Sequence, residues 1–167
     1  RPDKPKKISY TGAYTFAKPG LYNNVLIEDF SAMYPSCIIS ANISFETLNG
    51  DISIPNSNTT FDSKVSGIIP SILKNMIAVR NNLKKKYKET GDESYNIQQE
   101  SIKMGVINSL YGMFGYNRSR IFNIKVAEAI TGMARDLIKF MKDKFEYKGY
   151  NVIYGDTDSL FIQGILN

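Results

Sequence analysis

Three aspartates stand beside strongly apolar stretches, where an isolated charge is costly to bury. Asp156 and Asp158 lie one residue apart between two apolar runs, and Asp29 follows Val25–Ile27. A single aspartate at such a place has a simple explanation, because aspartate tolerates turn dihedrals and bonds its own backbone. Three carboxylates brought together would repel one another unless divalent cations neutralised them. We therefore expect a pair of Mg²⁺ ions ~3.5–4 Å apart, an arrangement suited to phosphoryl displacement.

The composition narrows the chemistry further. The chain has 167 residues and a formal net charge of +5, so a polyanionic partner is permitted but not required. It contains no histidine, which excludes an imidazole base or ligand from within the chain. Its one cysteine, Cys37, can form neither an internal disulfide nor a cysteine zinc site, and its apolar neighbours predict a buried thiol. The remaining carboxylates, lysines, arginines and hydroxyls are typical of magnesium-dependent reactions.

Helices must carry part of the framework around these residues. Apolar residues recur at helical spacing from about Pro70 to Glu89, with Pro70 expected as the first helical residue. A second helix is expected over about 93–110, joined to the first across Gly91-Asp92 as an antiparallel hairpin. A third, longer helix is expected over about 126–147.

Short apolar runs predict the strands. The chain is expected to form a strand at 25–29 and a β-hairpin at 151–162, while 49–66 has the composition of a loop with room for a short strand. The segments near residues 27 and 155 are expected to pair, which would bring the aspartates together. The predicted fold class is α+β: an antiparallel sheet backed by the long helix, with the helical hairpin inserted as an arm.

Two basic residues of the first helix stand out by position. Arg80 falls on the same stripe as the apolar residues Met76 and Leu83, where a solvated charge would be out of place. Lys84 follows one turn later on that side of the helix. Both residues could form a basic edge with buried stems and solvated charges, or they could bind an anion. The pattern alone leaves both interpretations open.

Three ordered segments resemble the motifs of family B DNA polymerases. Asp29–Ser36 is similar to motif A, Asn108–Gly112 is similar to the end of motif B, and Tyr154–Ser159 matches motif C letter for letter. Tyr10–Ala13 is also similar to the Y-x-G-G/A element that contacts the template strand. The resemblance covers essentially the whole chain and is least diagnostic over 49–66.

The resemblance implies a DNA-directed DNA polymerase, a nucleotidyltransferase that uses two Mg²⁺ ions, for which Mn²⁺ can substitute. Asp29 and Asp158 are the implied main ligands of both ions, joined by Phe30, and Asp156 is a supporting catalytic residue. Tyr34 matches the steric gate that excludes ribonucleotides. The implied nucleotide-binding residues are Ala32, Met33, Tyr34, Arg80, Lys84, Lys103, Asn108 and Tyr111, and the implied template-binding residues are Tyr10, Gly12 and Gly112.

One position departs from the family pattern. The motif B lysine normally precedes the asparagine by four residues, but here Met104 holds that position and Lys103 lies five residues before Asn108. One residue rotates a helix by about 100°, which would turn Lys103 away from the nucleotide. We expect a one-residue π-type bulge between Lys103 and Asn108 to restore its direction; without one, the contact would be lost.

The resemblance also implies a division of the chain into palm (1–67), fingers (68–118) and palm again (119–167). No thumb or exonuclease domain is expected within these 167 residues. We therefore expect the chain to be a piece of a larger polymerase, with poor activity on its own. Its implied partners are primer–template DNA, deoxynucleoside triphosphates, the remainder of the polymerase and a sliding clamp. It is expected inside the cell with the replicating DNA, in the cytoplasm or nucleoid or in a virus-infected host cell. No apolar run reaches the ~18 residues of a membrane span.

Three other functions remain open from the sequence. A protein-primed polymerase of the same family would usually carry a long insertion before the helical hairpin, and none is seen in this span. A fragment that binds nucleic acid as a basic scaffold is a second alternative. A degenerate paralogue is disfavoured by the presence of Asp29 and Asp158, although the shifted position of Lys103 leaves room for it. The third alternative is an unrelated nucleotide cyclase with an aspartate-bearing, palm-like sheet. That function would not explain the tyrosine in Asn108–Gly112.

Overall fold

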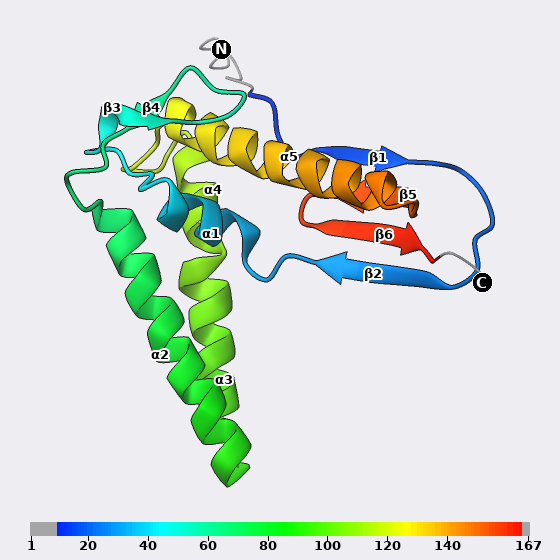
Figure 1. Ribbon diagram of the computed structural model, residues 1–167. Helices are drawn as coiled ribbons and strands as arrows, with labels where there is room; N and C mark the ends of the chain where they lie inside the picture. The colour runs from blue at the N-terminus through cyan, green and yellow to red at the C-terminus, as the bar shows by residue number, and fades with distance from the viewer. Residues whose placement is uncertain (1–9, 165–167) are drawn as a thin grey trace, which may run out of the picture.

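The computed structural model describes residues 10–164 and has the expected α+β architecture (Figure 1). Predictions that fall on 1–9 and 165–167, including the outer ends of the proposed palm segments, lie outside the described residues. None of the described helices is long and apolar enough to cross a membrane. The elements in chain order are β1 Thr15–Ala17, β2 Val25–Asp29, α1 Met33–Ser40, β3 Leu48–Ser53, β4 Thr60–Phe61, α2 Ile68–Thr90, α3 Glu93–Ile102, the π-helical segment η1 Lys103–Ile107, α4 Ser109–Gly115, α5 Ile124–Tyr147, β5 Asn151–Asp156 and β6 Ser159–Gln163.

The four-stranded sheet is antiparallel throughout, in the order β1-β5-β6-β2. The predicted hairpin at 151–162 is confirmed as β5 and β6. The expected pairing of the segments near 27 and 155 is wrong, because Ile27 of β2 lies opposite Phe161 of β6. The tight hairpin makes β6 the immediate neighbour of β5, and β1 occupies the other edge of β5, so β2 adds at the free edge of β6. The consequence is that β2 ends beside the turn of the hairpin (Figure 1).

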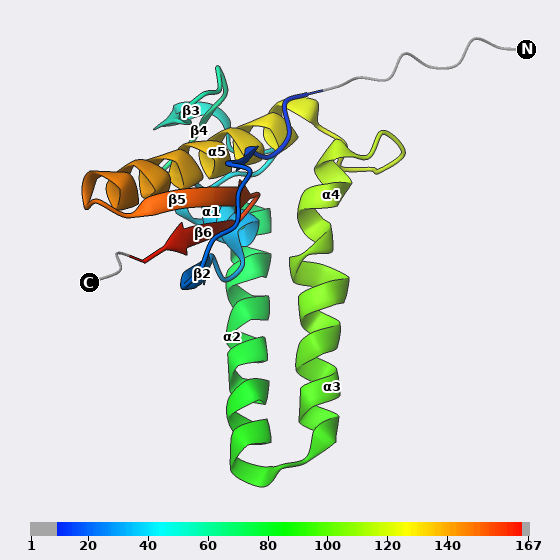
Figure 2. The ribbon, with the colours of Figure 1, turned by 90° about the vertical axis from the view of Figure 1, so that its right-hand side faces the viewer.

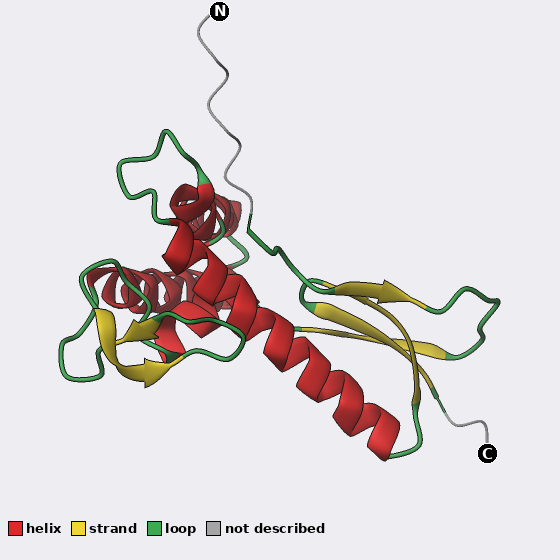
Figure 3. Cartoon of the chain, turned by 90° about the horizontal axis from the view of Figure 1, so that it is seen from above, coloured by secondary structure: helices red, strands yellow, loops and turns green. Residues whose placement is uncertain are grey.

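The long helix α5 confirms the prediction for 126–147 and organises both core clusters. In one cluster Ala134 and Ile138 of α5 pack with Cys37 of α1 and with Val152 and Leu160 of the sheet. The Cys37 side chain is 2% exposed, which confirms the predicted buried thiol. Seen from above, the four-stranded sheet lies toward the C-terminal end of α5 and the two-stranded β3–β4 sheet toward its N-terminal end (Figure 3). The strand expected in the loop is therefore present as part of a two-stranded sheet.

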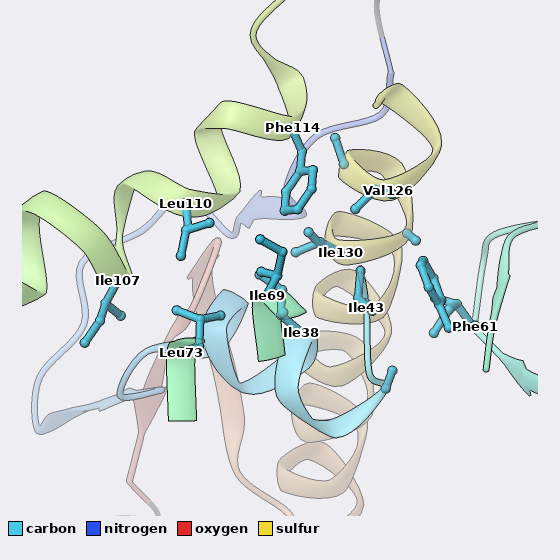
Figure 4. Packing of buried hydrophobic residues seen from close by; sticks show 14 residues of the cluster. Ile38, Ile43, Phe61, Ile69, Leu73, Ile107, Leu110, Phe114, Val126 and Ile130 are labelled. Atoms are coloured by element: carbon cyan, nitrogen blue, oxygen red, sulfur yellow. The ribbon is translucent and has the colours of Figure 1, made fainter. Parts of the chain in front are cut away.

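A second cluster joins the helical arm to this body. Leu73 of α2, Ile107 of η1 and Phe114 of α4 converge on Val126 and Ile130 at the start of α5 (Figure 4). All five side chains are at most 3% exposed. Burying side chains of this size contributes about 1.5–3 kcal/mol each. The base of the arm is thus fixed to the same helix that backs the sheet.

The arm itself is the predicted antiparallel helical hairpin, with α2 and α3 side by side (Figure 2). Its turn has the expected chemistry, since Gly91 adopts a left-handed φ of 69° and Asp92 accepts a hydrogen bond from the Ser94 N–H as the cap of α3. The first helix begins at Ile68 rather than at Pro70. Proline fits within the first turn because the N–H groups there have no intrahelical acceptor.

The predicted second helix is divided, and the expected π-type bulge is confirmed. Helix α3 ends at Ile102, and the five residues of η1 run from Lys103 itself to Ile107, the residue before Asn108. The Asn108 N–H donates to the Lys103 carbonyl at 3.0 Å, a bond that spans five residues instead of four. The extra residue is absorbed in this wider turn, so Lys103 and Asn108 lie on the same side of the helix.

Candidate active site

Two of the three aspartates meet where β2 ends beside the β5–β6 turn. Asp29 is the last residue of β2 and pairs with Ser159, the first residue of β6. The next residue, Phe30, donates its backbone N–H to the Asp158 carbonyl at 2.8 Å. Asp29 and Asp158 both line one pocket of about 500 Å³. This backbone pairing holds the two carboxylates at one end of the sheet.

The charges at this end of the sheet act on one another. Partial burial, followed by the charge of Asp29, raises the pKa of Asp158, and Asp156 adds to the rise. The ionised form of Asp158 is thus disfavoured by its burial and by the neighbouring carboxylates. A cation beside these carboxylates would favour the ionised form.

Asp156 has a different position from the other two aspartates. Its carboxylate accepts hydrogen bonds from the hydroxyls of Thr157 at 3.0 Å and Tyr154 at 3.3 Å. It does not line the pocket that Asp29 and Asp158 share. All three carboxylates lie at one end of the sheet, with Asp29 and Asp156 both paired to Ser159, but only Asp29 and Asp158 share the pocket.

The remaining donor set still fits a magnesium ion. Over residues 10–164, no group of three or more acidic, cysteine or histidine side chains is close enough to hold a metal. Mg²⁺ differs from structural metals in this respect, because it commonly binds one or two protein carboxylates and completes its shell with water and substrate phosphates. Asp29 and Asp158 meet that requirement, and Phe30, whose backbone carbonyl is a further candidate oxygen ligand, lines the same pocket.

Three cations of the helical arm reach the same pocket: Arg80 and Lys84 from α2, and Lys103 from η1. We call these three residues the basic cluster. The Arg80 side chain is only 17% exposed, as its place on the apolar stripe predicts, and within the described residues its buried Nε atom has no hydrogen-bond partner. The pocket thus combines two carboxylates from the sheet with three cations from the arm. This is an arrangement that can hold a polyanion and metal ions together.

Helix α1 begins at the same place. Its first turn receives no side-chain cap, because the N-cap residue is Ala32, in a left-handed conformation with φ 58° and ψ 52°. Such a conformation costs a non-glycine residue about 1–2 kcal/mol, and strain of this kind gathers at functional sites. Ala32, Met33 and Tyr34 line a smaller pocket of about 160 Å³ together with Asn108 and Asp158. An uncapped helix N-terminus favours anions.

Three tyrosines form a wall that connects α1, α4 and the N-terminal segment. The rings of Tyr34 and Tyr111 lie 4.3 Å apart, and the hydroxyls of Tyr111 and Tyr10 lie 2.8 Å apart. Burial is the main cause that raises the pKa of both Tyr34 and Tyr111. Both phenols are therefore neutral at physiological pH.

The two remaining predicted positions are glycines. The carbonyl of Gly12 accepts a hydrogen bond at 2.7 Å from Arg135, a residue of α5 that also donates to the Thr11 carbonyl at 2.6 Å. Gly112 lies on α4, and a Cβ there would meet nothing within 4 Å. Packing against the described part of the chain does not require glycine at position 112. Both glycines lie away from the pocket that holds the carboxylates.

Several site residues were not predicted from the sequence. Asn81 lines the main pocket beside the basic cluster, and Ser31 and Ser36 line it beside the carboxylates. Asn81 could have been found, because it lies one helical turn before Lys84. Arg135, which holds the N-terminal segment, gives no comparable signal, because its carbonyl partners are more than 120 residues away.

Comparison with known proteins adds independent information. A family model described as "DNA polymerase family B" matches residues 1–166. The chain is 34% identical over 164 residues to DNA polymerase 1 of Pyrococcus abyssi (strain GE5 / Orsay), an alignment covering 92% of the chain and 21% of that protein. It is 36% identical over 172 residues to the DNA polymerase alpha catalytic subunit of Arabidopsis thaliana, covering 97% of the chain and 11% of that protein.

A solved structure has the same fold. The family B DNA polymerase from the hyperthermophilic archaeon Pyrobaculum calidifontis aligns with a TM-score of 0.74 and 30% identity, over 97% of this chain and 23% of that one. The chain therefore spans about a fifth of the length of the archaeal proteins that it matches, and about a tenth of the plant protein.

Proposed function

Because the chain belongs to DNA polymerase family B, we propose that it forms the catalytic centre of a polymerase that adds deoxynucleotides to a primer 3′-OH under the direction of a DNA template. The observation that carries this proposal is the shared pocket, where Asp29 and Asp158 lie with the basic cluster. In this proposal residues 1–67 and 119–167 form the palm, and 68–118 form the fingers.

The carboxylates are the proposed metal ligands. Asp29 and Asp158, with the carbonyl of Phe30, would hold two Mg²⁺ ions, for which Mn²⁺ can substitute. Bound there, the ions would lower the pKa of the primer hydroxyl and neutralise charge on the phosphates. Asp156 would support the site from the end of β5, and its hydrogen bonds with Tyr154 and Thr157 favour that lesser role.

The basic cluster and the start of α1 are the proposed triphosphate site. Arg80, Lys84 and Lys103 would contact phosphate oxygens, and the uncapped first turn beginning at Ala32 would add backbone N–H groups. The Nε donor of Arg80 has no acceptor within residues 10–164, which supports this assignment, since a buried guanidinium nitrogen without an acceptor is costly. Charge that builds up on the phosphates during transfer would be stabilised by groups already in place.

The tyrosine wall is the proposed site of the sugar and the nascent base pair. Tyr34 would exclude a ribose 2′-OH, and its ring is held in place by Tyr111 at 4.3 Å. Asn108 and Tyr111 would line the base pair. Tyr10, Gly12 and Gly112 would contact the template strand. The hydrogen bond between the Tyr10 and Tyr111 hydroxyls supports a link between this template-binding site and the site of the nascent base pair.

The partners follow from the same proposal. They are primer–template DNA, deoxynucleoside triphosphates, the remaining parts of the polymerase and a sliding clamp, at the site of DNA replication within the cell. The short share of its relatives that the chain covers supports a dependence on those further parts.

The test is primer extension by the full-length protein. A labelled primer–template with one unpaired template base would be incubated with each deoxynucleotide in turn, with and without Mg²⁺. We expect extension by the complementary nucleotide alone and only with Mg²⁺. Binding of the DNA without any extension would contradict the proposal and would favour a nucleic-acid-binding scaffold.

A further inference from the structure

One acidic residue, Glu100 of α3, contacts two members of the basic cluster. Its Oε1 atom lies 3.8 Å from Nη2 of Arg80, and its Oε2 atom lies 3.8 Å from Nζ of Lys103. Arg80 comes from α2 and Lys103 from η1, so this single carboxylate bridges the two sides of the helical arm. It does not line the pocket that the cations share with Asp29 and Asp158. The Glu100 carboxylate therefore contacts the basic cluster from outside the pocket, and a second anion could bind the same cations from within the pocket.

The Glu100 carboxylate is held in its ionised form. The Gln99 side chain donates a hydrogen bond to its Oε1 atom at 2.9 Å, and this bond is the main cause that lowers the pKa of Glu100. The charges of Lys103, Arg80 and Lys84 lower it further. All three cations of the basic cluster thus act on this one carboxylate.

These contacts are weak enough to be exchanged. Charge-assisted hydrogen bonds between nitrogen and carboxylate oxygen are normally about 2.7–2.9 Å long, and both contacts are well beyond that. The side chains of Glu100 and Lys103 are 47% and 44% exposed, so water screens the pair. The buried Nε of Arg80 also lacks an acceptor among the described residues, so Glu100 leaves its partner incompletely satisfied.

We propose that Glu100 is an internal stand-in for the nucleotide's triphosphate, which holds the basic cluster together in the empty site and competes with an incoming triphosphate for it. This inference rests on the proposed function. In the empty protein the carboxylate offsets repulsion among three like charges. When a nucleotide binds, its more highly charged phosphates take over Arg80 and Lys103, and Glu100 is released toward solvent. Glu100 therefore sets nucleotide affinity without touching the reacting atoms.

The test variant is Glu100→Gln in the full-length protein. Glutamine keeps the length of the side chain and an oxygen acceptor for Gln99, while it removes the competing charge. We expect the apparent dissociation constant for the correct nucleotide, from single-turnover extension, to fall about two- to fivefold, the size of one exposed ion pair. The maximal rate should be unchanged, and the difference should shrink at high salt because screening weakens the competition.

The matched control is Glu89→Gln. Glu89 forms an exposed pair with Lys85 at the same 3.8 Å on the same arm, but neither residue lines the pocket. This control should leave nucleotide affinity unchanged. A Glu100→Gln affinity equal to or weaker than that of the unmodified protein would overturn the inference. So would an equal gain in the control, because it would reduce the effect to net charge. Glu100→Ala gives a second variant, with the same expected direction.

Binding of inorganic tripolyphosphate, measured by calorimetry on the same proteins, separates the two proposals. If the unmodified protein fails to extend a primer, the proposed function fails, while tighter tripolyphosphate binding by Glu100→Gln would still support the competition. If extension proceeds and tripolyphosphate affinity does not rise in the variant, the inference about Glu100 fails and the proposed function stands.

Discussion

Gly155, between the tyrosine and the first aspartate of the Tyr154–Ser159 turn, is required by a contact across the sheet. It pairs with Phe16 of β1, and a Cβ built at Gly155 would overlap the edge of the Phe16 ring and come within 3.0 Å of the Leu160 Cδ2 atom. Non-bonded carbons prefer separations of about 3.5–4.0 Å. We therefore predict that Gly155→Ala displaces Phe16 and destabilises the pairing of β1 with β5.

The size of the destabilisation depends on how far the Phe16 ring can move away from the added methyl group. Inserting a methyl group into a packed site costs about 1–3 kcal/mol. Phe16 lies on an edge strand and is half-buried, with Tyr14 as its aromatic neighbour at 5.5 Å, so it can relax in part. We expect a loss of about 1–2 kcal/mol in the local opening free energy, equivalent to about 5- to 30-fold faster amide exchange.

Native-state hydrogen exchange on the full-length protein is the assay. Two backbone bonds report on the contact between β1 and β5: the Lys18 N–H to the Ile153 carbonyl at 2.7 Å, and the Thr157 N–H to the Tyr14 carbonyl at 3.2 Å. Both amides should exchange faster in Gly155→Ala.

A double-mutant cycle with Phe16→Ala makes this prediction specific. Removing the ring makes room for the methyl group, so the double variant should be less destabilised than the sum of the two single variants. Gly112→Ala is the control, because a Cβ at that position meets nothing within 4 Å, and it should leave both amides unchanged. Additive effects of Gly155→Ala and Phe16→Ala would refute the steric reasoning.

Two further predictions concern the nucleotide site. Tyr34→Ala should raise ribonucleotide incorporation at least about tenfold, since it removes the steric contact with a 2′-OH; unchanged sugar selectivity in competition assays would remove the proposed gate. Lys103→Ala should raise the KM for nucleotides about tenfold by removing a charge-assisted phosphate contact. Deleting Gly105 should convert η1 to an α-helix and leave KM within about threefold, because Lys103 would then precede the asparagine by the four residues of one α-helical turn. A deletion as harmful as Lys103→Ala would contradict this account of the bulge.

The elements with regular patterns could be predicted from the sequence. The stripe around Leu73 and Arg80 identified α2, and the apolar runs on either side of Gly155 identified the hairpin. The π-type bulge was expected from the resemblance, because Lys103 lies one residue further from Asn108 than the lysine does in the family pattern. In each case the signal is local, because the residues that carry it are neighbours along the element.

The elements that depend on distant contacts could not be predicted. Helix α1 has no capping residue at Ala32, and β1 is three residues long in a turn-rich segment, so neither has a local pattern. The place of β6 between β5 and β2 follows from which strand edge stays free, which a hydrophobic run does not encode. For the same reason Asp156 could not be separated from Asp158 by the sequence pattern, although only Asp158 lines the shared pocket.

The central claim is that Asp29 and Asp158 form the catalytic pair, and a single measurement tests it most directly. The rate of single-nucleotide addition would be measured under single-turnover conditions with full-length Asp29→Asn and Asp158→Asn, each bound to primer–template DNA. Glu28→Gln is the matched control, because its side chain points to the opposite face of β2 from Asp29. We predict a loss of about a hundredfold or more in each aspartate variant, with DNA affinity retained and the control unaffected. Nucleotide addition near the unmodified rate by either aspartate variant would contradict the account.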